Sequence, residues 1–202
     1  MIGLMTERWF VPAFMDDLHL ARAAVVYAEE LHQGQRRESD DAPFVLHPLE
    51  VGALLHNTGH REVVVAAGIL HDTVEDTEAS LPQIAGRFGE EVAALVGALT
   101  EDPSIDDFAE RKEALREQIA HVGPDATSIY AADKVTKVRE LRARIAAQPD
   151  LVHSSDRDHA RLEHYRASLA MLEQITPEHA LVRQLRFELE ALAALPPGAD
   201  PA

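Results

Sequence analysis

The segment from His71 to Thr77 carries the side chains whose types and spacing say most about chemistry. It reads HDTVEDT and follows the apolar stretch VVVAAGIL. On a helix, His71 and Glu75 share one face, and Asp72 and Asp76 form a second such pair about 100° around the axis. This ridge costs stability unless positive charge lies beside it, and a divalent cation bound by imidazole and carboxylate supplies that charge. The alternative is a solvated acidic helix end with an incidental histidine.

Two residues elsewhere in the chain are candidates to complete a metal site. His47 stands before Pro48 after the apolar residues FVL, and Asp133 stands inside the segment SIYAADKV. Each also has a simpler interpretation. A lone histidine at a helix start is usually a cap or a surface residue. A buried aspartate in mid-helix needs a partner, which Lys134 or Lys137 can provide as an ion pair.

The elements that position these residues are predicted to be helices throughout, because alanine, leucine, glutamate and arginine dominate. A first helix, capped by Asp16 or Asp17, ends near Gly34, and residues 35–44 form a loop. A second runs from His47 to about Gly59, and a third runs from residues 60–62 into HDTVEDT. Later helices are expected at 80–89, 90–99, 108–121, 126–147 (one helix or two joined by a kink), 156–174 and 177–195, the last two as an antiparallel pair.

Length and composition agree with one all-α domain of about eight to ten helices. The chain has 202 residues, of which 46% are hydrophobic and 27% charged, as in ordinary globular proteins. We expect one domain over residues 1–202, with a metal core at about 21–141, a C-terminal helical pair at 156–195 and a frayed tail at 196–202. No apolar run reaches the ~18 residues of a membrane span, and the first residues lack the order of a signal peptide. The expected location is the cytoplasm, without a membrane partner.

The charge and the lack of cysteine exclude several classes of protein. There are 19 basic and 35 acidic side chains, so the formal charge is 19 − 35 = −16. Such an acidic chain is a poor candidate for binding nucleic acid. With no cysteine, disulfides, thiolate metal sites and a cysteine nucleophile are excluded, so a metal site must use histidine and carboxylate. A small nucleotide needs only local positive charge, which we expect in one cleft of an otherwise acidic surface.

The spaced combination of H, HD and D resembles the HD-domain phosphohydrolases. More narrowly, it is similar to the hydrolase domain of the RelA/SpoT-type alarmone enzymes and their single-domain relatives, the metazoan SpoT homologues among them. The resemblance covers about residues 21–141. It includes HQGQRR at 32–37, PF at 43–44, HP at 47–48, AAGILHDTVEDT at 66–77, FG at 88–89 and ADKV at 132–135.

This resemblance implies a stand-alone enzyme that removes the 3′-pyrophosphate from guanosine tetra- or pentaphosphate. Glu75 and Asp76 match the catalytic acidic pair, which orients a water and shuttles a proton. One metal ion, Mn²⁺ or else Fe, Co or Zn, lowers the pKa of a bound water and polarises a phosphoryl oxygen. By the resemblance, that ion would be bound by His47, His71, Asp72 and Asp133.

The resemblance also implies a set of substrate-binding residues. Arg37 matches an arginine that stacks on the nucleobase, a task suited to its flat guanidinium. Lys112, Arg161 and Tyr165 would face the phosphates or the ribose. Arg36 and Lys137 add positive charge near the same site. For each of these residues, a solvated surface side chain is the simpler alternative.

Three departures from the family pattern concern the nucleoside pocket. Glu38 stands where the family often has lysine, Lys137 stands where it usually has asparagine, and the loop ESDDAPF lacks the usual glycine. The small-molecule substrate is therefore open between guanosine tetraphosphate and another phosphate ester, such as the 2′-phosphate of NADPH or a nucleotide. A third hypothesis is a non-catalytic, metal-stabilised module that binds a nucleotide or a protein. The oligomeric state is open.

Overall fold

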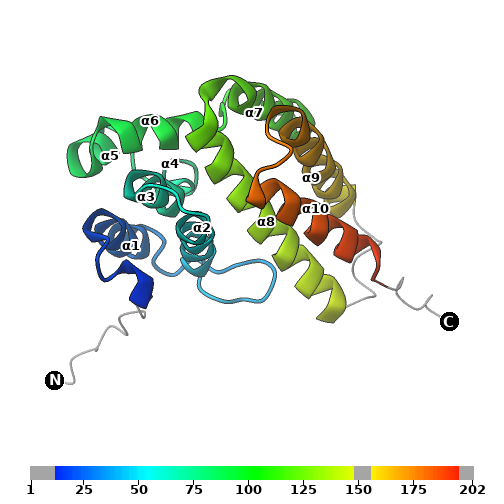
Figure 1. The fold of residues 1–202 in the computed structure, drawn as a ribbon, viewed down its shortest axis with the longest axis horizontal. Helices are drawn as coiled ribbons and strands as arrows, with labels where there is room; N and C mark the ends of the chain where they lie inside the picture. Colours follow the sequence, from blue (N-terminus) through cyan, green and yellow to red (C-terminus); the bar gives the residue numbers. More distant parts are fainter. Residues whose placement is uncertain (1–11, 148–155, 196–202) are drawn as a thin grey trace.

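The structure, a computed structural model, describes residues 12–147 and 156–195, and Figure 1 shows its helices. Within this part of the chain there are ten α-helices, one 3₁₀ turn and no strand, so the all-α prediction is confirmed. The elements in chain order are η1 (Ala13–Met15), α1 (His19–Leu31), α2 (Leu46–Asn57), α3 (Glu62–Leu70), α4 (Thr73–Asp76), α5 (Leu81–Phe88), α6 (Glu90–Leu99), α7 (Phe108–Val122), α8 (Pro124–Ala147), α9 (Asp156–Ile175) and α10 (Ala180–Ala193).

Helix α3 is the central helix of the N-terminal half, and it packs against α1, α2, α6 and α8. Residues 64–70 are all buried, as expected for a helix that is apolar on every side. Two glycines allow α2 and α3 to approach closely. A Cβ added at Gly52 would lie 2.7 Å from Ile69 Cγ1, and one at Gly68 would meet Leu55. This close packing brings the start of α2 beside the end of α3.

Helix α8 is the long helix that joins the two halves of the molecule, and it was predicted as one helix or two (Figure 1). It is one helix, and it begins at Pro124, two residues before the predicted start. Helix α10 packs along it and α9 lies against α7. Arg139 and Arg142 of α8 both bind the buried carboxylate of Glu188 on α10, at 2.6 and 2.8 Å. Asp133 lies in the middle of α8.

The predicted cap of the first helix is wrong. Leu18 occupies the N-cap of α1 and no side chain of its own segment caps it. Instead, Glu62 Oε1 accepts hydrogen bonds from the backbone N–H groups of Leu20 (2.6 Å) and Ala21 (3.3 Å). A carboxylate at the start of α3 therefore satisfies the free N–H groups of α1, as a cap from its own segment would.

The prediction of one continuous helix through HDTVEDT is also wrong. Helix α3 ends at Leu70, His71 and Asp72 form a turn, and the four-residue helix α4 follows. The hydroxyl of Thr73 donates to the carbonyl of Leu70 (2.6 Å), which satisfies an orphan acceptor at the helix end. The candidate metal-binding pair, His71 and Asp72, therefore lies at a turn between two helices.

The C-terminal pair is present as α9 and α10, and α10 begins later than predicted, with the His179 side chain accepting from the Leu181 N–H. The predicted frayed tail at 196–202 lies outside the described residues. None of the described helices is long and apolar enough to cross a membrane.

Candidate metal centre and adjoining cavity

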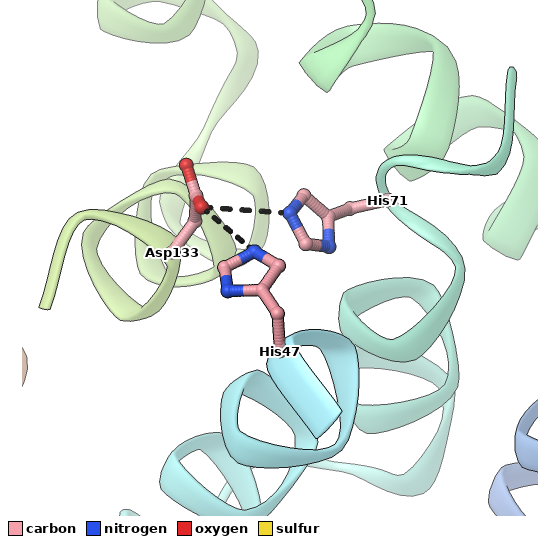
Figure 2. A group of neighbouring side chains, drawn as sticks. All are labelled: His47, His71 and Asp133. Atoms are coloured by element: carbon pink, nitrogen blue, oxygen red, sulfur yellow. Dashed lines mark ion pairs between the residues drawn. The ribbon is translucent and has the colours of Figure 1, made fainter. Parts of the chain in front are cut away.

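Three buried side chains from three helical segments converge on one point. His47 comes from the first turn of α2, His71 from the turn after α3 and Asp133 from α8, as Figure 2 shows. Asp133 Oδ1 lies 3.2 Å from His47 Nε2 and 3.6 Å from His71 Nε2. One ligand atom from each of the three lies within 4.8 Å of the others. The close crossing of α2 and α3 sets the two imidazoles side by side, with ring centroids 5.3 Å apart.

Asp72 adds a second carboxylate to the same point. Its Oδ1 lies 3.0 Å from His71 Nε2 and its Oδ2 lies 3.4 Å from His47 Nε2. The structure therefore brings together all four residues that the family resemblance implied as metal ligands. They come from sequence positions up to 86 residues apart, 133 − 47.

Hydrogen bonds on the outer sides of the imidazoles orient both rings. His71 Nδ1 lies 2.8 Å from the Gly68 carbonyl, which can only accept a hydrogen bond. The Thr136 hydroxyl donates to the Asp133 carbonyl (2.8 Å) and therefore accepts from His47 Nδ1 (3.1 Å). In the neutral rings both Nε2 atoms then carry lone pairs directed at the carboxylates. Such outer hydrogen bonds are the usual way in which proteins orient histidine ligands of metals.

Within the part of the chain that the structure describes, each of the four residues has one buried polar atom without a hydrogen-bond partner, and these atoms are those that face the centre. They are His47 Nε2, His71 Nε2, Asp72 Oδ2 and Asp133 Oδ1. Buried polar atoms are nearly always paired, so four orphans at one point require an explanation. Two imidazole nitrogens and two carboxylate oxygens are a donor set that fits a divalent transition metal.

The ion pair that the sequence suggested as the simpler role of Asp133 is also present, and it uses one of the two carboxylate oxygens. Lys134 Nζ lies 2.6 Å from Asp133 Oδ2, the ion pair that the sequence allowed. The other oxygen, Oδ1, is the one that faces the two histidines. The ion pair and a metal site are therefore compatible.

The electrostatics of the cluster favour positive charge at its centre. Burial by itself lowers the pKa of both imidazoles, but the carboxylates outweigh it. Asp72 and Asp133 raise the pKa of His71 to about 10, and the same two carboxylates raise the pKa of His47 to about 9. Conversely, burial raises the pKa of the two aspartates, but their charged neighbours lower it below the ordinary value. Either protons or a metal ion can supply the positive charge.

The predicted catalytic pair lies on α4, directly after this turn, and both side chains remain accessible to solvent but lose part of their hydration to surrounding residues. Glu75 Oε1 accepts from the Glu101 N–H at 2.6 Å. Loss of hydration, together with the negative charges of Asp72 and Glu101, raises the pKa of Glu75 to about 7. Loss of hydration and Asp72 also raise the pKa of Asp76. Two carboxyl groups whose pKa values lie above the ordinary range are suited to proton transfer.

A cavity of about 360 Å³ lies beside the cluster of His47, His71, Asp72 and Asp133, and every predicted substrate-binding residue is part of its lining. Lys134 and Lys137 connect the two, because they contact Asp133 and Asp72 (2.6 and 3.7 Å) and also line the cavity. Phe44, Phe108 and Leu141 supply apolar wall. The predicted residues in the lining are Arg36, Arg37, Lys112, Lys137, Arg161 and Tyr165.

Three lining residues with nitrogen-bearing side chains, Lys134, Arg144 and His164, were not predicted to bind the substrate. Lys134 and Arg144 share a face of α8 with Lys137, at a spacing of three and seven residues. That periodicity was available in the sequence, but only the fold shows that this face meets a cavity. His164 gave no signal, because a lone histidine in a charged helix is usually a surface residue.

The predicted substrate-binding residues differ in how strongly other side chains hold them. Arg37 is ion-paired with Asp40, Glu50 and Glu140. Lys112 is paired with Glu101, and the Arg36 guanidinium donates to the Asp41 carbonyl at 3.0 Å. Stacking of Arg37 on a nucleobase stays a prediction, and it requires these ion pairs to rearrange.

Comparison with known proteins relates the chain to hydrolases. Residues 24–161 match the family model described as HD domain. The human guanosine-3′,5′-bis(diphosphate) 3′-pyrophosphohydrolase MESH1 is 36% identical over 124 residues, which are 60% of this chain and 69% of that protein. A metazoan ortholog of SpoT, described as hydrolysing ppGpp, superposes with a TM-score of 0.71 at 26% identity, over 91% of this chain and 96% of that one. A Listeria monocytogenes crystal structure gives 0.62 at 28% identity, over 71% and 99%.

Proposed function

Since the chain belongs to the HD-domain family, among the RelA/SpoT-type hydrolases, we propose that it removes the 3′-pyrophosphate of guanosine tetra- or pentaphosphate. The products are GDP or GTP and pyrophosphate. The observation that carries the proposal is the set of four orphan atoms beside a cavity lined with cationic side chains. A polyphosphate ester is the kind of substrate that needs both.

We propose Mn²⁺ as the bound metal, held by one atom each from His47, His71, Asp72 and Asp133. When bound, the ion supplies Lewis acidity toward a phosphoryl oxygen and lowers the pKa of a bound water. Thr136 and the Gly68 carbonyl hold the two imidazoles in the tautomer that this ligation needs.

Glu75 and Asp76, the acidic pair on α4, transfer the protons of the reaction. Hydrolysis forms a bond between the water oxygen and the phosphorus, and breaks the bond from that phosphorus to the 3′-oxygen. Glu75 takes one proton from the attacking water, because its raised pKa suits a base near neutral pH. Asp76, whose pKa is also raised, delivers a proton to the departing 3′-oxygen.

The cationic side chains of the cavity bind the phosphate groups and the walls enclose the nucleoside. Lys137 and Lys134 lie at the end next to the metal ligands, where negative charge on the reacting group is greatest. Tyr165 and Phe44 offer aromatic surface to the base or ribose. This arrangement supports a nucleotide bearing several phosphates as the substrate.

The test is to strip the purified protein of metal, restore Mn²⁺, and offer guanosine tetraphosphate, NADPH and a generic phosphodiester in parallel. Pyrophosphate release from the first supports the proposal. If only NADPH is hydrolysed, with release of phosphate, then NADPH and not guanosine tetraphosphate is the substrate. Turnover of none of the three would favour the binding-module hypothesis.

A matched pair of variants tests the assigned base. We expect Glu75→Gln to lower kcat by about 10²- to 10⁴-fold, the usual contribution of a general base, while elemental analysis finds the metal still bound. The control is Glu78→Gln, an exposed carboxylate three residues on. Full activity in Glu75→Gln would show that Glu75 is not the base.

A further inference from the structure

An ion-pair cluster lies at the end of the cavity that is remote from the metal ligands. The carboxylate of Glu38 lies among three arginines, which we term the arginine cluster. The Glu38 carboxylate oxygens lie 2.7 Å from Arg161 Nη2, 3.3 Å from Arg157 Nη1 and 4.0 Å from Arg144 Nη1. Glu38, Arg144 and Arg161 line the cavity. Arg157 is not one of the lining residues, but it contacts the same Glu38 carboxylate.

The arginine cluster is built from two helices and carries more positive than negative charge. Arg157 and Arg161 are four residues apart on α9 and share a face. Arg144 comes from α8 and is held at 2.5 Å by Asp158, which also lies 3.9 Å from Arg161. Three guanidinium groups thus face two carboxylates. Release of Glu38 alone would leave a net charge of about +2 at this end of the cavity.

The arginine cluster is too far from the metal ligands to act on the same phosphate. Arg144 follows Asp133 by eleven residues on α8, which corresponds to about 16 Å along the helix axis. Even with the reach of an arginine side chain, the cluster meets a different part of any ligand bound at the metal. A nucleotide with phosphate groups on both sides of its ribose has such a second part.

We propose that the arginine cluster is a subsite for a second phosphate or diphosphate group of the substrate, and that Glu38 occupies this subsite until that group displaces it. This inference rests on the proposed function, since it assigns a place to the group that is not hydrolysed. Glu38 then competes with any group that enters the subsite: a 5′-diphosphate displaces it, a group of lower charge displaces it less readily, and a ligand that leaves the subsite empty is unaffected.

The physical reason for the exchange is the difference between a carboxylate and a phosphate. The Glu38 side chain is 53% exposed, and ion pairs with that exposure contribute little to stability. A phosphate group carries more charge and more acceptor oxygens, and it suits bidentate binding by arginine. Hydrogen bonding to Arg161 lowers the pKa of Glu38, so its carboxylate is ionised and competes at neutral pH.

The experiment is calorimetric titration of the Mn²⁺-loaded protein with GDP, which has a 5′-diphosphate and no 3′-phosphate. Removal of one exposed ion pair should tighten binding to Glu38→Gln by about two- to fivefold. Loss of a charge-assisted hydrogen bond should weaken binding to Arg144→Gln by about tenfold or more. The control is Glu163→Gln, which removes one negative charge from α9, at a side chain that is ion-paired with Arg166.

The outcomes separate this inference from the proposed function. If Glu38→Gln and Glu163→Gln change GDP affinity equally, only the overall charge matters and the subsite is disproved. If GDP binds more tightly to Glu38→Gln and more weakly to Arg144→Gln, but guanosine tetraphosphate is not hydrolysed, the subsite is supported and the proposed reaction is disproved. With turnover, Glu38→Gln should lower KM for guanosine tetraphosphate at unchanged kcat. It should leave KM unchanged for the 3′-diphosphate of guanosine without a 5′-phosphate.

Discussion

Thr136 shows how one hydroxyl group can orient a candidate metal ligand, His47. It donates to the Asp133 carbonyl on its own helix and accepts from His47 Nδ1 on α2. The residue has no metal-ligating role of its own. Because its only hydrogen is used by the carbonyl, the imidazole must keep its proton on Nδ1 and direct Nε2 at the carboxylates.

We therefore expect Thr136→Val to bind Mn²⁺ about 10- to 100-fold more weakly, the usual cost of losing such an outer contact. Competition with a chelator measures the affinity. Thr127→Val is the matched control, because Thr127 is a buried threonine of the same helix and its hydroxyl donates to the Gly123 carbonyl. Equal Mn²⁺ affinities in the two variants would show that Thr136 does not orient His47 for metal binding.

His164 is a buried imidazole that the structure keeps neutral. Its Nδ1 accepts from Arg116 at 2.9 Å. Burial and the charges of Lys134, Lys112 and Arg116 lower its pKa to about 2, from an ordinary value of 6.5. In the unfolded chain it regains the ordinary value and takes up a proton below that pH. Folding stability is therefore lost as pH falls below about 6.5, by up to about 1.4 kcal/mol per pH unit.

The variant His164→Asn keeps an acceptor for Arg116 and cannot titrate. It should lose less stability than the wild type between neutral pH and pH of about 5, measured by urea unfolding at each pH. His159→Asn, an exposed histidine of the same helix, is the control and should follow the wild type. Parallel losses in all three proteins would contradict the assignment.

At the scale of elements, the crossing of α2 and α3 decides where the two histidines meet. Gly52 lies against Ile69 at this crossing, and a methyl group there has no room. A Cβ added at Gly86, on α5, would meet no atom within 4 Å outside its own segment. Both glycines are helical, so the helix propensity of alanine favours substitution equally at the two positions, and packing alone separates them.

Gly52→Ala should lower the free energy of unfolding by about 1–3 kcal/mol, the usual cost of overpacking. Gly86→Ala should instead raise it by up to about 1 kcal/mol, because alanine is the better helix former. Chemical denaturation measures both. A stabilised Gly52→Ala variant would mean that α2 and α3 can separate freely.

At the scale of the whole molecule, a bound metal would join α2, the turn after α3, and α8. These segments are far apart in the sequence, so the ligand set exists only in the folded chain. A ligand that binds only the native state raises stability by RT ln(1 + [L]/Kd), about 2.7 kcal/mol at a hundredfold excess over Kd.

Saturating Mn²⁺ should accordingly raise the melting temperature of the wild type, and a chelator should reverse the rise. Asp133→Ala should abolish this shift whatever its own melting temperature. Asp125→Asn, a surface carboxylate of the same helix that pairs with Arg61, should keep it. A shift that survives in Asp133→Ala would place the metal elsewhere.

The fold of the whole molecule also determines where the basic side chains gather. The chain has a formal charge of −16, yet seven of its 19 basic side chains line one cavity. This agrees with positive charge gathered in one cleft. An acidic exterior disfavours nucleic acid, and a local cationic cavity suits a small polyanion.

Local spacing and side-chain type in the sequence were enough to predict an all-helical fold and most of the helices, because those features depend on neighbours a few residues apart. The four candidate metal ligands were implied by the resemblance to the HD-domain family, since spacing alone left simpler interpretations open for His47 and Asp133. The sequence did not predict that Glu62 caps α1, that the helix breaks at His71, that Arg37 is held by three carboxylates, or that Glu38 lies among arginines of α8 and α9. Each of these depends on contacts between distant segments, or on a competition among nearby hydrogen bonds, and only the packing of the helices decides such contacts.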